Sequence, residues 1–391
     1  MYIACNYLQN HAIIGTMKTY RFKFYQHKRN RYLKRTINAS ASIYNHCIAL
    51  HKRYYRMFGK TLNCAKLQKH IAKLRNRNPY WQLVGSQAVQ DICQRIERGY
   101  KLFFDHHKKG VRPPSFKKTK KYRSFTLKQA GYKFLGGNRV KIGSKTYQFW
   151  NSQNIEGKIK TVTIKRFPTG DLYLVVVTDA LGQAENKFET GKIAGFDFGL
   201  KTFLTTSDNE QIASPLFLKA NLKALRRLSK AHSRKRKGSH NRNKARLDLA
   251  RLYEDISNQR RDFFWKLAHR LTDEYDYLFF EDLNLKGMVK LWGRKVHDLA
   301  FAEFLEILQW VALKKDKVVH FISRWYPSSK TCSNCGHVLE KLEMETRMWR
   351  CPCCQQVNNR DENAAINIKN VGASTFSLGD VSRSARVAIA A

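Results

Sequence analysis

The sequence predicts an α+β protein of two or three domains with a metal-binding module close to its C-terminus. At residues 19–25, aromatic and basic side chains alternate with period two, which indicates a half-buried strand. Apolar residues then recur every three or four positions, a spacing typical of amphipathic helices. The predicted helices span 31–58, 62–75 and 83–107. Much later come two Cys-x2-Cys pairs, at 332–335 and 351–354. A chain of 391 residues is long enough to bury a core in each domain.

The charge of the chain indicates a polyanionic partner. Its formal net charge is +43 at pH 7, and so basic a body repels itself unless a polyanion neutralises it. Nucleic acid fits better than an anionic membrane, because the basic residues are spread along the chain among Tyr, Phe and Trp side chains. No apolar run approaches the roughly 18 residues of a membrane span, and the N-terminus lacks a signal-peptide pattern. We therefore expect no membrane partner and a location inside the cell.

The first half of the chain continues after the helices through a polar connector at 108–121, which contains Gly and Pro. Short strands follow. The clearest pair is 159–166 and 172–178, joined by the turn Pro-Thr-Gly-Asp at 168–171. The polar stretch at 181–191 is the expected domain boundary.

The second half opens with an apolar strand at 192–199 that contains Asp197, paired with a strand at 202–206. Two long helices are expected between 218 and 274, the first running into a basic loop at 233–239. We interpret this loop as a phosphate-tracking surface and not merely a solvated face, because it adds to an already basic body. The remaining predicted elements are a buried strand at 277–282, a helix at 299–315, a strand at 317–322 and a helix at 361–369. From residue 371 the tail is expected to be disordered.

The cysteine spacing predicts a zinc ribbon. Two Cys-x2-Cys pairs separated by fifteen residues form two knuckles whose four thiolates can enclose one structural Zn²⁺. Gly336 and Pro352 shape the two turns, and spacing favours Cys351 with Cys354 over Cys353. The predicted ligands are Cys332, Cys335, Cys351 and Cys354. Free thiols are expected at Cys5, Cys47, Cys64 and Cys93.

Three acidic residues form a second candidate site. Asp197 and Glu281 lie at the ends of predicted strands, and Asp361 begins a predicted helix. Each alone has an ordinary explanation, since an Asp that opens a helix usually caps it. Together, in a protein that binds polyanions, they suit a phosphodiesterase with two Mg²⁺ ions about 3.5–4 Å apart. Neighbouring strand residues face opposite ways, so Glu281 and Asp282 cannot both point into the site, and the pattern alone does not choose between them.

Four motifs carry a resemblance to a known family. They are Gly-Phe-Asp-Phe-Gly-Leu at 195–200, Phe-Glu-Asp-Leu-Asn at 280–284, Pro-Ser-Ser-Lys-Thr-Cys-Ser-Asn-Cys-Gly at 327–336 and Arg-Asp-Glu-Asn-Ala-Ala at 360–365. In this order they resemble TnpB, the transposon-encoded RNA-guided DNA endonucleases related to the type V CRISPR effectors. The likeness runs from Met17 to about Lys369. The chain departs from the family at Asn359, where an acidic residue is common, and residues 1–16 precede the usual start.

The resemblance implies a RuvC-like nuclease domain with the RNase H fold, into which the zinc ribbon is inserted. It also implies an N-terminal β-barrel wedge domain that carries an inserted helical recognition domain. The wedge would comprise 17–28 and 116–190, recognition 29–115, the nuclease 191–329 and 357–370, and the ribbon 330–356, a target nucleic-acid-binding module; 1–16 would be an upstream-start extension and 371–391 a disordered tail. The implied Mg²⁺-binding catalytic triad is Asp197, Glu281 and Asp361, with Asp197 shared between the ions.

The function implied by the resemblance is RNA-guided cleavage of double-stranded DNA beside a short target-adjacent motif. The guide RNA would come from the transposon end, and the enzyme would act in the cytoplasm of a bacterium or archaeon, at the nucleoid when bound to DNA. Two alternatives remain open. One is a nuclease-inactive, RNA-guided DNA-binding repressor, and the other is a transposase, because the same two-metal chemistry can transfer a strand.

Overall fold

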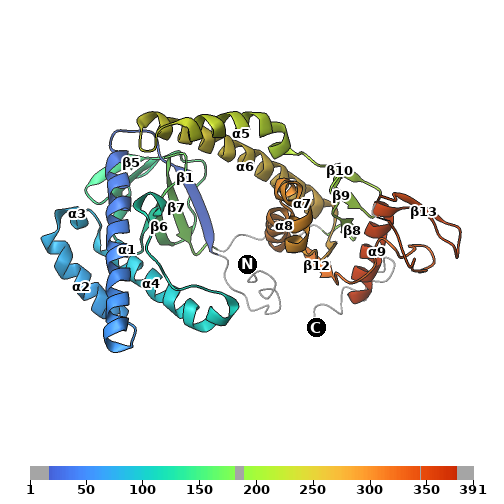
Figure 1. Ribbon diagram of the computed structural model, residues 1–391, viewed down its shortest axis with the longest axis horizontal. Coiled ribbons are helices and arrows are strands. Elements are labelled where there is room, and N and C mark those ends of the chain that lie inside the picture. The colour runs from blue at the N-terminus through green and yellow to red at the C-terminus, as the bar shows by residue number, and fades with distance from the viewer. Residues whose placement is uncertain (1–16, 181–188, 344, 377–391) are drawn as a thin grey trace. The chain divides into compact units, whose positions relative to one another are not determined.

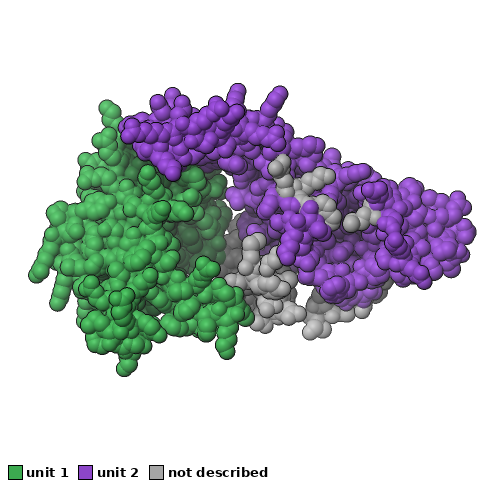
Figure 2. Space-filling view, viewed as in Figure 1, with its two compact units in different colours: residues 1–182 green, residues 183–391 purple. Residues whose placement is uncertain are grey.

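The structure is a computed structural model that describes residues 17–180, 189–343 and 345–376. The chain divides into two compact units, residues 1–182 and 183–391, which Figure 2 shows in green and purple. Within the described residues, no helix combines the length and the apolar character that crossing a membrane requires.

The first unit contains two antiparallel sheets. Four strands lie in the order β1-β7-β6-β2. Their bounds are Lys18–Lys23 for β1, Leu172–Thr178 for β7, Ile159–Arg166 for β6 and Ser124–Leu127 for β2. The second sheet is formed by β3 (Tyr132–Phe134), β4 (Arg139–Ile142) and β5 (Lys145–Gln148). In β1 the aromatic residues Tyr20 and Phe22 are buried and the residues between them face outward, which confirms the predicted period of two.

Helices of the first unit share one apolar core with the four-stranded sheet. They are α1 (Asn30–Phe58), α2 (Cys64–Arg77), the short α3 (Pro79–Gln82) and α4 (Ser86–His106), with single 3₁₀ turns at His107–Lys109 and Thr119–Lys121. The helix predicted at 83–107 starts later than expected, at Ser86, because its N-cap Gly85 has an extended backbone, with φ −61° and ψ 156°. Three predicted free thiols, Cys47, Cys64 and Cys93, are buried in these helices, and Cys5 lies outside the described residues.

The second unit is built on a five-stranded mixed sheet in the order β10-β9-β8-β11-β12. Figure 1 labels its strands β8, β9, β10 and β12. The bounds are Gln211–Ala213 for β10, Thr202–Thr206 for β9, Ile193–Asp197 for β8, Tyr277–Glu281 for β11 and Val318–Ile322 for β12. Strands β8, β11 and β12 are parallel, whereas β9 and β10 are antiparallel to their neighbours. The predicted β8–β9 hairpin is confirmed.

Helices cover both faces of this sheet. On one face α6 (His240–Glu274) and α8 (Phe301–Lys314) pack on β8, β9 and β11, and α5 (Phe217–Arg234) packs on α6. On the other face α9 (Arg360–Thr375) crosses β8 and β11. The sequence analysis did not foresee α7 (Leu285–Leu299), which lies between β11 and α8.

Helix α9 corrects the expected start of the disordered tail. The helix continues to Thr375, and both Gly372 and Ala373 are buried. A Cβ atom on Gly372 would lie 2.2 Å from the ring of Phe279, so only glycine lets the helix approach β11 this closely. The polar, small-residue composition that suggested disorder is therefore a packing feature here. The tail from 377 onward lies outside the described residues.

The predicted ribbon precedes α9 directly. Its hairpin pairs β13 (Met348–Arg350) with β14 (Val357–Asn359), and α9 begins at the next residue. A small cluster of Trp349, Cys332 and Cys351 forms its core.

Candidate functional site

Strand alternation places two of the predicted acids on the same face of the sheet. In β11, Leu278 and Phe280 enter the core beneath α6 and α8, while Phe279 packs toward α9. Glu281 continues the α9 side, because successive strand residues alternate between faces. Phe196 of β8 pairs with Phe280 in the parallel register, so the residues that follow each of them, Asp197 and Glu281, lie at the same level of the sheet.

The third acid reaches this face through α9. A Cβ atom on Gly195 would lie only 2.2 Å from the backbone oxygen of Ala365 and 2.4 Å from the backbone nitrogen of Lys369. Strand β8 and helix α9 therefore touch backbone to backbone, which explains the first glycine of the Gly-Phe-Asp motif. Asp361 lies in the first turn of α9, after Asn359, whose side chain accepts a hydrogen bond of 3.1 Å from the N–H of Asp361. The residue that departs from the family pattern thus caps the helix that carries the third acid.

The three carboxylates act on one another electrostatically. The pKa of Asp197 is raised from 3.8 to about 8. Burial is the largest cause, the negative charges of Asp361 and Glu281 add to it, and the positive charges of Arg360 and Arg347 oppose it. Charges shift a pKa noticeably only at short range, so Asp361 and Glu281 both lie near Asp197. Glu281 follows Asp197 by 84 residues in the sequence, and Asp361 follows Glu281 by 80.

The structure also separates Glu281 from Asp282. The hydroxyl of Ser328 donates a hydrogen bond of 3.3 Å to Oε2 of Glu281, while Asp282 pairs with the guanidinium of Arg324. Burial raises the pKa of Glu281, the Ser328 hydrogen bond lowers it, and the charge of Asp282 raises it. Glu281 is therefore the acid on the side of Asp197, which the sequence pattern alone left open.

Arg347 is a residue that the sequence analysis missed. Its guanidinium donates to both oxygens of Asp361, at 2.8 and 3.0 Å, and it comes from the loop just before β13. A single nitrogen, Nη1, makes both contacts, and this ion pair joins the ribbon to the acid at the start of α9. No sequence signal identified this arginine among the many basic residues of the chain.

Two buried asparagines on α9 hold the segment that precedes the ribbon. Asn363 donates to the carbonyl of Thr331 at 2.7 Å and accepts from the N–H of Ser333 at 2.9 Å. Asn367, one turn later, donates to the carbonyls of Ser328 and Thr331 at 2.8 and 2.6 Å. Helix α9 therefore positions both its own acid and the hydroxyl that contacts Glu281. Asn363 belongs to the Arg-Asp-Glu-Asn motif, and this motif was the sequence feature from which its role could have been predicted.

The acidic site has the chemistry of a binding site for hard cations. Three carboxylates supply only oxygen donors, which Mg²⁺ prefers. Burial and the negative charges of Asp361 and Glu281 raise the pKa of Asp197, and a bound cation would offset the repulsion between the carboxylates. Their donor atoms therefore suit a divalent ion.

The four predicted zinc ligands form one cluster. The sulfur atoms of Cys332, Cys335, Cys351 and Cys354 all lie within 4.8 Å of one another. Cys332 and Cys354 are 3.7 Å apart, and Cys335 and Cys351 are 3.6 Å apart, sulfur to sulfur. A tetrahedron with metal–sulfur bonds of about 2.3 Å has edges of about 3.8 Å. The cluster therefore has the dimensions of a structural zinc site, and the exposed Cys353 is not part of it.

The two knuckles of the ribbon have the same backbone plan. The N–H of Gly336 donates to the carbonyl of Cys332 at 2.9 Å, and the N–H of Gln355 donates to the carbonyl of Cys351 at 3.0 Å. Both residues follow the second cysteine of their pair and have positive φ, 75° for Gly336 and 60° for Gln355. The predicted role of Gly336 in shaping its turn is thus confirmed, and Gln355 takes the equivalent position in the second knuckle.

Crowding splits the pKa values of the clustered thiols. The pKa of Cys354 is lowered to about 6, mainly by the hydrogen bond from the N–H of Gln356. The N–H of His337 acts to lower the pKa of Cys335, but burial and the neighbouring sulfurs outweigh it and raise this pKa to about 12. One thiolate among four sulfurs opposes ionisation of the others. A divalent cation bound by all four thiolates would remove this opposition.

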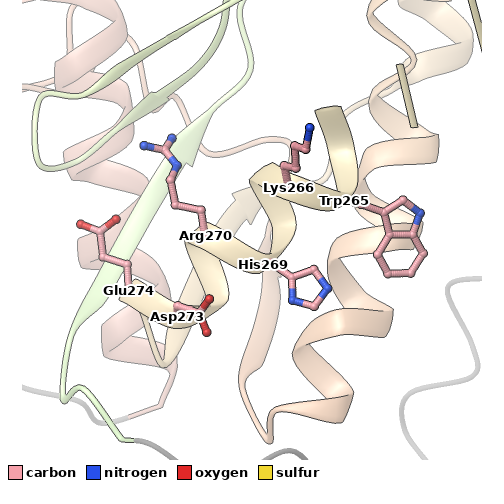
Figure 3. A pocket seen from close by; sticks show the side chains of 6 residues that line it. All are labelled: Trp265, Lys266, His269, Arg270, Asp273 and Glu274. Atoms are coloured by element: carbon pink, nitrogen blue, oxygen red, sulfur yellow. The ribbon is translucent and has the colours of Figure 1, made fainter. Parts of the chain in front are cut away.

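A surface depression elsewhere in the second unit contains none of these residues. It has a volume of about 790 Å³, and all six of its lining residues come from α6 (Figure 3). They are Trp265, Lys266, His269, Arg270, Asp273 and Glu274. Three of these residues are in ion pairs, Arg270 with Glu210, Asp273 with Lys315 and Lys266 with Asp262.

Comparisons with known proteins agree with this arrangement. Residues 173–291 match a family model described as "Probable transposase", and residues 301–368 match one described as "Cas12f1-like, TNB domain". A protein of Streptomyces pristinaespiralis named "Putative RNA-guided DNA endonuclease" is 28% identical over 372 residues, covering 93% of this chain and 91% of that protein. A similarly named Escherichia coli K12 protein, InsQ, is 25% identical and covers 90% and 92% of the two chains.

Solved structures show the same fold. The chain superposes on a Cas12f1 protein, solved as a "Cas12f1-sgRNA-target DNA complex", with a TM-score of 0.54 and 16% identity, over 88% of this chain and 83% of that one. A "mini-RNA-guided endonuclease", Cas-phi3, gives a TM-score of 0.54 at 9% identity, over 91% and 92%. The mixed helix-and-sheet fold is thus that of the compact Cas12f and Cas-phi effectors. Together with these structures, the matching family models and relatives support a TnpB-type protein.

Proposed function

We propose that the protein is an RNA-guided DNA endonuclease encoded by a transposable element, which hydrolyses phosphodiester bonds at Asp197, Glu281 and Asp361. The observation that carries the proposal is the convergence of these three acids, from three separate segments, at one edge of a mixed sheet. The relatives and the fold neighbours whose names include RNA-guided endonucleases support it. The net charge of +43 supports nucleic acid as the partner.

The three acids would hold two Mg²⁺ ions, with Asp197 in the central position. Bound Mg²⁺ supplies an activated water and stabilises the leaving oxygen. Ser328 holds one oxygen of Glu281 in place. Arg347 neutralises Asp361, and we propose that it moves toward a DNA phosphate when a cation takes over that charge.

The other parts of the chain would bind the nucleic acids. We propose the wedge and recognition assignments for 17–190 and the RuvC-like nuclease for 191–370, interrupted by a zinc-binding ribbon at 330–356. Guide RNA from the transposon end and target duplex would be bound through backbone and shape, with base pairing supplying specificity. Residues 233–238, which form the end of α5 and the loop after it, are all exposed, which suits contact with phosphates. The zinc would hold the ribbon folded, and thereby keep Arg347 beside Asp361.

One experiment tests the proposal directly. The protein is expressed together with the flanking DNA of its own locus, and the RNA that copurifies is sequenced. We expect one discrete RNA whose 3′ end extends past the element, and cleavage in Mg²⁺ of DNA that matches this extension. Asp197→Ala should abolish cleavage while guided DNA binding survives. Cleavage by Asp197→Ala at the parental rate would refute the assignment of the acids, and heterogeneous RNA would refute guidance.

A second candidate function is DNA strand transfer, which the description of the matching family as "Probable transposase" favours. The same acids could direct a 3′ hydroxyl in place of water. Joined DNA ends among the products, lost in Asp197→Ala, would establish this function and replace hydrolysis. Guided binding without cleavage by the parent protein would instead establish the repressor alternative.

A further inference from the structure

Trp325 exposes more of its surface than any other large hydrophobic side chain in the described residues. Its relative exposure is 85%, and the next value is 72%, at Leu291. The other large side chain of the same turn, Tyr326, packs against the core that α9 covers. Within this turn, Trp325 is therefore the exposed aromatic side chain and Tyr326 the packed one.

The turn that carries Trp325 is fastened on both sides to the end of β11. Before it, the guanidinium of Arg324 pairs with Asp282. After it, the hydroxyl of Ser328 donates to Glu281 at 3.3 Å. The turn itself is closed by the N–H groups of Trp325 and Tyr326, which donate to Oγ and the carbonyl oxygen of Ser323 at 3.3 and 3.1 Å. The indole is therefore held in a defined place although its ring is free.

That place is close to the three acids. Trp325 precedes Ser328 by three residues, which span at most about 11 Å of extended chain. Successive nucleotides of a duplex strand rise by about 3.4 Å. An aromatic ring at this distance can reach a base within about three nucleotides of a phosphate at the acids.

We propose that Trp325 stacks on a nucleobase of the DNA strand that is being cleaved, within about three nucleotides of the scissile phosphate. This proposal rests on the proposed function, because it takes the three acids as the cleavage site. The net charge of +43 supports a nucleic-acid occupant. Beside the acids, Arg324 and Arg347 are paired with Asp282 and Asp361 and keep 38% and 45% of their side chains exposed. Stacking would also remove from water an indole that is otherwise almost fully hydrated.

The first arm of the test needs neither guide nor cleavage. Binding of a 12-nucleotide single-stranded DNA is measured by fluorescence anisotropy for the parent, Trp325→Ala, Trp325→Phe and the control Trp310→Ala, which removes another exposed tryptophan, on α8. Loss of one stacking contact should weaken binding about 5- to 150-fold in Trp325→Ala, and Phe should restore most of it. Thermal stability should not change, because the side chain is exposed. Equal affinity of parent and Trp325→Ala would overturn the proposal.

The second arm locates the base. The guide-loaded parent and Trp325→Ala are bound, without Mg²⁺, to target DNA that carries 2-aminopurine at single positions near the cut, in one strand or the other. Stacking on an indole quenches 2-aminopurine, so one position in one strand should be quenched in the parent and not in Trp325→Ala. Quenching that is the same in both proteins would overturn the proposal, as would a dimer of the parent that Trp325→Ala abolishes. A parent that cleaves no guided target would refute the proposed function, while the first arm still decides whether Trp325 binds bases.

Discussion

Replacing Asp197 with asparagine should stabilise the metal-free protein at pH 8 and abolish its nuclease activity. In the folded protein the pKa of Asp197 is raised from 3.8 to about 8. Between these values the unfolded chain has an ionised Asp197 and the folded protein a protonated one. Folding therefore takes up a proton, and the stability of the parent falls as the pH rises from about 4 toward 8. An asparagine has no charge to bury and does not suffer this loss.

The size of the effect follows from the shift. Each pKa unit corresponds to about 1.4 kcal/mol, so Asp197 costs the parent at most about 4 kcal/mol between pH 5 and pH 8. Water reaches the half-buried carboxylate, which reduces the expected cost to about 1–2 kcal/mol. For a unit of this size, that difference is about 2–8 °C in melting temperature.

The assay is thermal unfolding of parent and Asp197→Asn at pH 5 and pH 8, in EDTA and in Mg²⁺. The asparagine variant should melt higher than the parent at pH 8, and the gap should narrow at pH 5. Mg²⁺ at a hundred times its Kd should stabilise the parent by about 2.7 kcal/mol and leave the variant unchanged. A variant that is less stable than the parent at both values of pH, or that gains equally from Mg²⁺, would refute the reasoning.

Three further predictions test the neighbouring parts of the site. Glu281→Gln should abolish cleavage in a gel assay while Asp282→Asn leaves most of it, because only Glu281 lies on the side of Asp197; equal losses would contradict this. In metal analysis, Cys354→Ser should reduce the bound zinc from one equivalent to none, whereas Cys353→Ser should retain the zinc, since Cys353 lies outside the sulfur cluster. Zinc retained by Cys354→Ser would show that other residues bind the metal. Gly195→Ala should lower the free energy of unfolding by about 1–3 kcal/mol in urea, because its Cβ would lie 2.2 Å from a backbone oxygen of α9; an unchanged midpoint would show that α9 can move away.

Local patterns predicted most of the elements and the residue types of both sites. Strand β11 could be predicted because its apolar residues are followed directly by an acid. The ribbon could be predicted because four cysteines have the spacing of metal ligands. Helix α7 was not predicted. The end of α9 was placed too early, because the composition at Gly372 and Ala373 resembles that of a disordered tail, whereas Gly372 packs against Phe279. Side-chain partners such as Arg347 and Asn367 were not predictable, since nothing in their own segments distinguishes them from other basic or polar residues.

The sequence by itself determined the chemistry available to this protein: a basic body, four thiols at ligand spacing and acids at the ends of strands. These are local properties, set by residue type and by periods of two or 3.6 residues. Only the tertiary structure decided that Glu281, and not Asp282, lies on the side of Asp197, and that Arg347 meets Asp361. Such choices depend on which face of the sheet α9 covers and how closely it approaches at Gly195, and these follow from packing between segments distant in sequence.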